Sequence, residues 1–304
     1  RHKLVFNAVL ISLAALVLLI VGAWWQLYRA HDTSTFFYRI SQIAPLPVGS
    51  IDGEAVRYSD YLLYYRPSEY YLNKFDEIDA SSADGELQLE YKKRDAMDRA
   101  ISDAYARKIA REQNLEVTNE EVDQSLESLK QADNGTLTDE AIRSSAQQVF
   151  GMTESDTRTQ YRNSILRSKA AFSLDQDAST TSEDIKKRIT SKKSLESIAD
   201  TLNKQEKDSV AYGVSGLVSR STVSNGVKVS EIATAKRDVV SGPLKSLTSD
   251  GYLFYRVIAI NDREVNFEFL QVPLKTFREN VEALKSSGKV SEYIDINPEK
   301  YTEK

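Results

Sequence analysis

The sequence contains no cysteine and only two histidines, and these absences exclude several classes of chemistry. Without cysteine there is no disulfide, no thiol nucleophile and no Cys-ligated zinc site. His2 and His31 both lie near the N-terminal end. The rest of the chain therefore lacks an imidazole for acid–base catalysis, for a Ser-His-Asp triad or for a metal site. Carboxylate pairs and a Ser–Lys dyad are left open, but no such pair stands out. We expect no metal, no cofactor and no ordinary enzyme activity.

The chain also lacks an excess of positive charge. Its formal net charge is −5, and acidic and basic residues are interspersed. A nucleic-acid partner would call for a clustered basic face, so we expect no nucleic-acid binding. With 304 residues, the chain is long enough for about two domains at roughly 100–200 residues each.

One long uncharged run is present at the N-terminal end, over residues 4–25, and it closes with Trp24 and Trp25. A helix needs about 20 apolar residues to cross a bilayer, and tryptophan favours the bilayer interface. A cleaved signal peptide is the alternative, but its apolar core is only about 7–15 residues long. We therefore predict an uncleaved transmembrane helix over residues 4–25 and a linker over residues 26–46. The flanking charges are balanced and leave the orientation open.

Residues 47–175 carry helical periodicity and are predicted to form an α-helical domain. It opens with a strand and a tight turn at Asp52-Gly53, followed by a helix that begins near Tyr58. Tyr58, Tyr61 and Tyr65 recur at helical spacing and are expected to face the core. Two further tyrosines lie off that stripe and are candidates for contact with a client or partner. They are Tyr64 and Tyr71.

Capping residues indicate where the later helices of this domain begin and end. A long helix is predicted over residues 86–113, and Thr118 with Glu121 forms a capping box before the next. Thr138 and Thr153 open two more helices, and the first of these ends at Gly151. Asn134-Gly135-Thr136 matches a glycosylation sequon, but we interpret it as a turn.

The periodicity changes after a polar boundary at residues 175–182. Short helices come first, and β-rich runs follow at residues 210–218, 252–260 and 265–272. Residues 182–277 are therefore predicted to form a small α+β domain, and residues 278–304 a C-terminal helix and tail. The predicted fold class is α+β, with an N-terminal transmembrane helix ahead of the helical domain.

Several segments together resemble the membrane-anchored or secreted chaperone-foldases of the SurA, PrsA and PpiD type. VGSIDGEAVRYSDYL resembles the strand, turn and helix that open the family's chaperone domain. AISDAYARKIAREQNLEVTNEEVDQSLESL resembles its central helix pair, and FGMTESDTRTQYRNSILRSKA its closing helices. The resemblance implies a helical chaperone domain followed by a parvulin-type prolyl isomerase domain.

The second half resembles the parvulin pattern with departures. GVSGLVSR and VVSGPLKSLTSDGYLFYRV are similar to two of its strand segments. Active parvulins carry facing histidines on their first and last strands, but this chain has Leu253 at the matching position of the last strand. The usual first strand is missing, and we interpret FEFLQV as its replacement, with Phe269 nearest the histidine position. The resemblance thus implies a parvulin-like domain without isomerase activity, whose apolar pocket would be lined by Leu217, Leu253, Tyr255 and Phe269.

These features lead to a functional hypothesis. We expect a membrane-tethered chaperone, or holdase, that binds unfolded or exported polypeptides and does not catalyse isomerisation. The resemblance would place its C-terminal ectodomain outside the cytoplasm, as a single-pass protein of the cell membrane. The alternative is a structural or scaffolding subunit that uses the same domains to dock one partner in a membrane complex.

Overall fold

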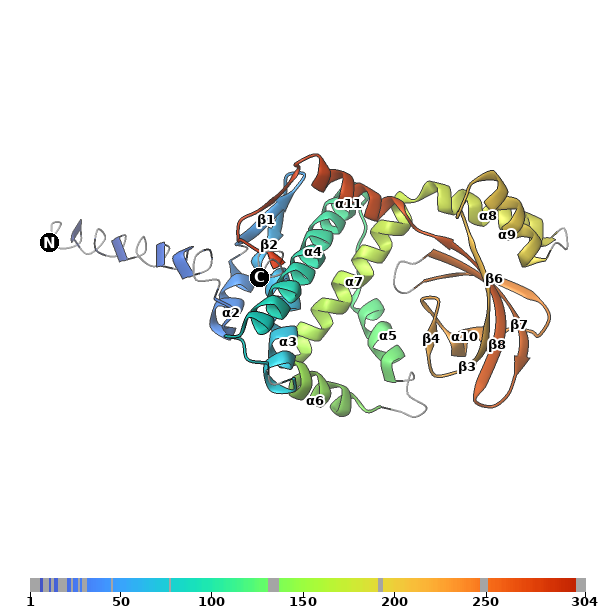
Figure 1. Cartoon of the computed structure of the whole chain (residues 1–304), viewed down its shortest axis with the longest axis horizontal. Coiled ribbons are helices and arrows are strands. Elements are labelled where there is room, and N and C mark those ends of the chain that lie inside the picture. The colour runs from blue at the N-terminus through green and yellow to red at the C-terminus, as the bar shows by residue number, and fades with distance from the viewer. Residues whose placement is uncertain are drawn as a thin grey trace. The chain divides into compact units, whose positions relative to one another are not determined.

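The computed structural model describes residues 32–44, 46–76, 78–130, 137–190, 194–246 and 251–298, and scattered positions between Phe6 and Tyr28 (Figure 1). The chain divides into two compact units. The first comprises Arg1–Ala104 with Gly288–Lys304, and the second comprises Tyr105–Ser287. Helix α4 (Ala83–Gln113) contributes its first part to one unit and its last turns to the other.

The prediction of a transmembrane helix is wrong for the part of the chain that the structure describes. There, no helix combines the length and the apolar character needed to cross a membrane. The long helices α4 and α7 (Glu154–Leu174) fail because charged side chains recur along them, and each such residue is costly at the centre of a bilayer. Most of residues 4–25 lie outside the described residues. The fold class is corrected to α+β, and the single-pass membrane localisation that rested on this helix is corrected with it.

The first unit is built around a small antiparallel sheet of strands β1 (Pro47–Ile51), β2 (Glu54–Arg57) and β9 (Val290–Glu292), in the order β2-β1-β9. Asp52 and Gly53 join β1 to β2, and both have positive φ, at 47° and 83°. This is the geometry of the two-residue hairpin turns that Asp-Gly favours, as the sequence predicts. Helices α2 (Thr35–Ile43), α3 (Tyr58–Lys74) and the first part of α4 also belong to this unit.

The tyrosine stripe of α3 forms part of the core of the first unit, which confirms the prediction. Tyr58, Tyr61 and Tyr65 are each at most 2% exposed. The Tyr58 and Tyr61 rings meet edge to face, and the Tyr61 and Tyr65 rings stack at an interplanar angle of 4°. Burial raises the pKa of each of these phenols well above its usual value.

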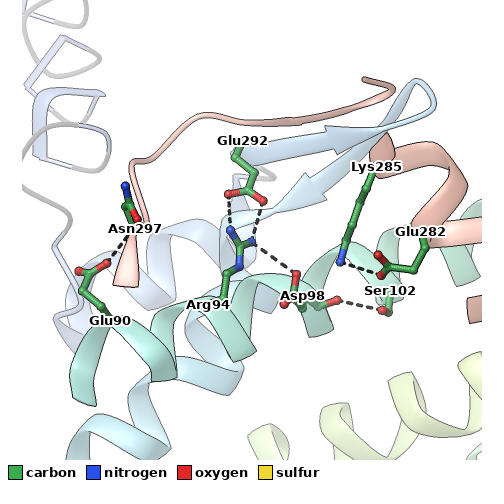
Figure 2. Close-up of polar contacts among 8 residues, drawn as sticks. All are labelled: Glu90, Arg94, Asp98, Ser102, Glu282, Lys285, Glu292 and Asn297. Carbon is green, nitrogen blue, oxygen red and sulfur yellow. Dashed lines mark hydrogen bonds and ion pairs between the residues drawn. The ribbon is translucent and has the colours of Figure 1, made fainter. Parts of the chain in front are cut away.

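The C-terminal segment returns to the first unit and adds its outer strand. β9 pairs with β1, and the Tyr293 N–H donates to the Val48 carbonyl at 2.9 Å. Figure 2 shows that Glu292 reaches Arg94 of α4, while the Asn297 N–H donates to the Glu90 carboxylate at 3.1 Å. A Cβ at Gly49 would lie 2.5 Å from the Ser291 carbonyl oxygen, so only glycine allows this close pairing.

The helical part of the second unit contains α5 (Asn119–Lys130), α6 (Asp139–Phe150) and α7, followed by α8 (Gln176–Thr190) and α9 (Leu195–Gln205). The caps predicted from the sequence are present. Thr118 and Glu121 exchange hydrogen bonds of 2.9 and 3.2 Å, and Gly151 ends α6 in a left-handed conformation. The turn predicted at Asn134-Gly135 lies outside the described residues.

The rest of the second unit contains a four-stranded antiparallel sheet in the order β3-β8-β7-β6. The strands are β3 (Ala211–Ser219), β6 (Val240–Lys245), β7 (Gly251–Ile260) and β8 (Glu264–Pro273). Helices α8 and α9 pack on one face, where Phe254 and Leu270 are fully buried. The short hairpin β4 (Val223–Ser224) and β5 (Val227–Lys228) and helix α10 (Val229–Ile232) belong to the opposite face, and α11 (Thr276–Ser286) follows β8. The segment FEFLQV, residues 267–272, belongs to β8 and pairs with β7.

Candidate functional site

The described part of the second unit contains a pocket of about 430 Å³ between three helices, α5, α6 and α7. This volume lies in the range typical of ligand pockets. Apolar side chains and charged side chains of both signs share its lining. The lining residues are Asp123, Leu126, Glu127, Asp139, Ile142, Arg143, Ala146, Glu154, Thr157 and Arg158.

Helix caps fix the two helices on one side of this pocket. The Thr138 hydroxyl accepts from the Ala141 N–H at 3.1 Å and starts α6. At its other end, α6 stops at Gly151, whose φ is 64°, and the Thr153 capping box starts α7 after a short turn. Because both helix ends are defined within a few residues, α6 turns back onto α7, and its side chains Ile142 and Ala146 line the pocket.

Polar contacts at the start of α5 fix the third wall. Arg162 of α7 donates to the Val117 carbonyl at 3.1 Å and to Asn119 Oδ1 at 2.7 Å. Lys169 pairs with Glu121 at 2.6 Å, and hydrogen bonding to Lys169 lowers the pKa of Glu121 below its usual value, with help from the Thr118 N–H. Two long side chains of α7 therefore hold the N-terminal end of α5.

Two ion pairs bridge the helices at the rim of the pocket. Arg158 of α7 pairs with Asp123 of α5 at 2.6 Å, and Arg143 of α6 pairs with Glu154 of α7 at 3.6 Å. The carboxylates are about 60% exposed, so each pair contributes at most about 1 kcal/mol and is weakened by salt. Leu126, Ile142 and Ala146 are half-buried beside them. The pocket thus offers an apolar surface with a charged, solvated rim, which suits an amphipathic segment of polypeptide.

The two tyrosines proposed for contact lie in different environments. Tyr64 is 7% exposed, and its hydroxyl donates to Asp103 Oδ2 at 2.7 Å. Tyr71 is 38% exposed, and its ring lies against that of Phe75, with centroids 5.4 Å apart. The structure therefore places Tyr71 at the surface of the first unit and Tyr64 inside it. A binding role for either stays a prediction.

The four candidates in the sheet are only partly brought together. Leu253, Tyr255 and Phe269 share one face of the sheet, where Leu253 and Tyr255 are 1% and 5% exposed. The Phe269 ring covers Gly213, because a Cβ there would lie 2.8 Å from its Cζ atom. Leu217 lies apart from them on the outer strand and is 60% exposed. Three of these residues thus form a filled core, and Leu217 is the accessible one.

The residues of the helical pocket were not identified as a site from the sequence. The apolar positions of α5 and α6, such as Leu126 and Ile142, could be assigned to helix faces by their spacing. The spacing of apolar residues within one helix does not show which other helix that face packs against. The pocket between the three helices therefore could not be predicted from the sequence. Within the described ranges, no cluster of three or more histidine, cysteine, aspartate and glutamate residues could hold a metal ion.

A family model described as the SurA-like N-terminal domain matches residues 1–171. Every residue that lines the helical pocket falls within this match, and the four-stranded sheet follows it in the sequence. No curated protein and no solved structure matches the chain.

Proposed function

The chain belongs to the family of the SurA-like N-terminal domain, and from this membership we propose that it is a holdase, a chaperone that binds unfolded polypeptides and keeps them from aggregating. Membership in this family supports a chaperone-like function and the binding of polypeptide substrates. The observation that carries the proposal is the position of the helical pocket, which lies wholly within the matched residues.

The chemistry of the pocket suits this role. Burial of apolar surface is favourable by about 25 cal/mol per Å² before the entropic costs of association, and it does not require one particular sequence. Leu126, Ile142 and Ala146 would take up apolar side chains of the bound segment. The exposed ion pairs at the rim would contact its polar flanks weakly, so that a bound chain can still leave.

We propose further that the sheet takes part in binding and not in catalysis. It carries no histidine, and Leu253 occupies a buried position on β7. The exposed aromatic pair Tyr71 and Phe75 of the first unit would offer a second apolar contact for a client.

A substitution inside the pocket tests the proposal. Ile142→Asp places a charge on the apolar surface and should abolish the suppression of aggregation of reduced, unfolded α-lactalbumin, followed by light scattering. Gln147→Asp adds the same charge to α6 at an exposed position that does not line the pocket, and should leave suppression intact. Circular dichroism must show equal helical content for both variants.

Two results would contradict the proposal. Equal suppression by the Ile142→Asp and Gln147→Asp variants would show that the pocket does not bind clients. Failure of the unaltered chain to suppress the aggregation of any unfolded protein, together with the recovery of one stoichiometric partner after crosslinking, would favour a scaffolding subunit.

A further inference from the structure

Strand β3 forms one edge of the four-stranded sheet. It pairs with β8 on one side, and within the described residues no strand lies along its other side. Figure 1 shows β3 at the border of this sheet. An edge strand presents backbone N–H and C=O groups that another extended chain can pair with.

The register identifies which residues present these groups. The Phe267 N–H donates to Ser215 Oγ at 3.0 Å, so Phe267 directs its backbone groups toward β3. Because this direction alternates along a strand, Phe269 does the same and pairs with its register partner Gly213. Tyr212 and Val214, on either side of Gly213, therefore direct their backbone groups away from the sheet.

The alternation changes at a bulge between Val214 and Leu217. Gly216 adopts a φ of +66° there, which glycine tolerates without strain. Beyond the bulge Leu217 lies opposite Asn266, whose backbone groups point toward β7. Leu217 consequently also faces outward. The outer edge thus presents the backbone groups of Tyr212, Val214 and Leu217.

The side chains of this edge lack the features that usually prevent pairing. The nine residues of β3, AYGVSGLVS, contain no charge and no proline. Val214 and Leu217 are 55% and 60% exposed. The opposite edge, β6, carries both Pro243 and Lys245. Proline and lysine are common means of blocking an edge strand, so the residues of β6 protect that edge, whereas β3 has neither residue type.

We propose that the outer edge of β3 binds one extended, uncharged segment of an unfolded polypeptide by strand addition. The nature of the occupant rests on the proposed function. Backbone pairing is independent of sequence, and alternate apolar side chains of the segment would contact Val214 and Leu217. An uncharged edge takes an uncharged segment without enclosing an unpaired charge.

A second copy of this chain is a poorer occupant than an unfolded segment. If two copies paired through β3, each strand would carry the same bulge between Val214 and Leu217 and would be held by its own sheet. Neither strand could then adjust its backbone to the bulge of the other. An unfolded segment can adapt its own backbone to the change of register at Ser215 and Gly216.

The experiment uses the full chain and a labelled short peptide of alternating valine and threonine, with binding followed by fluorescence anisotropy. Val214→Pro removes one outward N–H and is tolerable on an edge strand, whereas Val214→Thr keeps that N–H. We expect about tenfold weaker binding by Val214→Pro, equivalent to about 1.4 kcal/mol, and near-normal binding by Val214→Thr. A peptide N-methylated at every residue has no N–H group on either edge, so it should not bind to the unaltered chain or to either variant. This comparison tests backbone pairing even if Val214→Pro folds poorly.

Other results would overturn the inference. Equal binding of the N-methylated and unmodified peptides would show that side chains alone are recognised. A concentration-dependent dimer that Val214→Pro converts to a monomer, without peptide binding, would assign the edge to a second copy. A chain that suppresses aggregation but does not bind the peptide would refute strand addition and leave the proposed holdase function in place.

Discussion

Arg94 of α4 and Glu292 of β9 form a bidentate ion pair across 198 positions of sequence, with nitrogen to oxygen distances of 2.6 and 2.9 Å. Both side chains are less than a third exposed, and Asp98 lies 3.5 Å from the same guanidinium. The forked geometry of arginine matches a carboxylate closely, so such pairs are among the stronger ones. The pair joins strand β9 to helix α4 within the first unit.

Replacement of Arg94 should destabilise the first unit. Arg94→Ala removes both hydrogen bonds to Glu292, and we expect the free energy of unfolding to fall by about 1–3 kcal/mol, as for hydrogen bonds to charged groups. Urea denaturation measures the loss. Asp95→Ala is the matched control, because its pair with Arg99 is exposed on both sides and should contribute at most about 0.5 kcal/mol. Equal losses in the two variants would show that the C-terminal strand is not held by Arg94.

The C-terminal segment as a whole should stabilise the first unit. Deletion of residues 288–304 removes β9 and the buried side chains of Ile294 and Ile296. We expect a clear fall in the thermal midpoint of the first unit, because β1 loses a partner strand and the core loses apolar contacts. Differential scanning calorimetry of the full and shortened chains measures it. An unchanged midpoint would show that this segment only rests on the surface.

The helix ends could be predicted from the sequence, but the pairing of β9 with β1 in the first unit could not. Thr118, Glu121, Gly151 and Thr153 act through neighbours within a few residues, so their type and spacing determine the caps. The pairing of β9 with β1 has no such local signal, because Val290–Glu292 is a three-residue strand whose partner lies at the other end of the chain. Long-range pairing depends on the tertiary structure.

The candidate site shows the same limit. The tyrosine stripe of α3 follows from helical spacing, but the burial of Tyr64 depends on Asp103 of α4, which a pattern within α3 does not reveal. Likewise, the alternation of β8 indicates a strand, while its place between β3 and β7 is decided by the sheet as a whole. Leu253 and Tyr255 are buried because a chain segment from β5 to α10 covers that face.

Tyr64 and Tyr71 should respond differently to substitution. Tyr64→Phe removes the hydroxyl that donates to the buried Asp103, and we expect a loss of about 1–3 kcal/mol in the free energy of unfolding. Tyr71→Ala should change stability little, because this side chain is exposed, and should weaken the suppression of aggregation. Chemical denaturation and light scattering separate the two effects. A large stability loss for Tyr71→Ala would assign its ring to the core.

Asp175 should make stability depend on pH at the acidic end. Burial alone would raise the pKa of this carboxyl, but hydrogen bonds from the backbone N–H groups of Ala178, Thr276 and Lys275 outweigh burial and lower it. Because the pKa is lower in the folded chain, the carboxylate stabilises the fold at pH values above its pKa in the unfolded chain, which is about 4. This stabilisation is lost as the pH falls through the pKa of the folded chain.

The measurement for Asp175 is a comparison of the unaltered chain with Asp175→Asn over a range of pH. Asparagine keeps the shape of the side chain and one acceptor oxygen but cannot ionise. We expect the unaltered chain to be more stable than the variant at neutral pH, with a difference that shrinks below about pH 4. A difference that is constant down to strongly acidic pH would contradict the assignment.

The sheet of the second unit should bind polypeptide segments without accelerating prolyl isomerisation. Rotation about an ordinary amide has a barrier of about 18–20 kcal/mol, and that about an X–Pro bond is slow as well, so catalysis needs groups that favour the twisted amide over the planar one. The only histidines are His2 and His31, and the face that holds Leu253 and Tyr255 is filled by apolar side chains. An isomerisation assay on a proline tetrapeptide should therefore match the uncatalysed rate over the whole range of protein concentration. An acceleration that rises with concentration and disappears on Leu253→Asp, in a variant that keeps its β-sheet signal, would show that this face is a catalytic site and that the filled core opens to admit substrate.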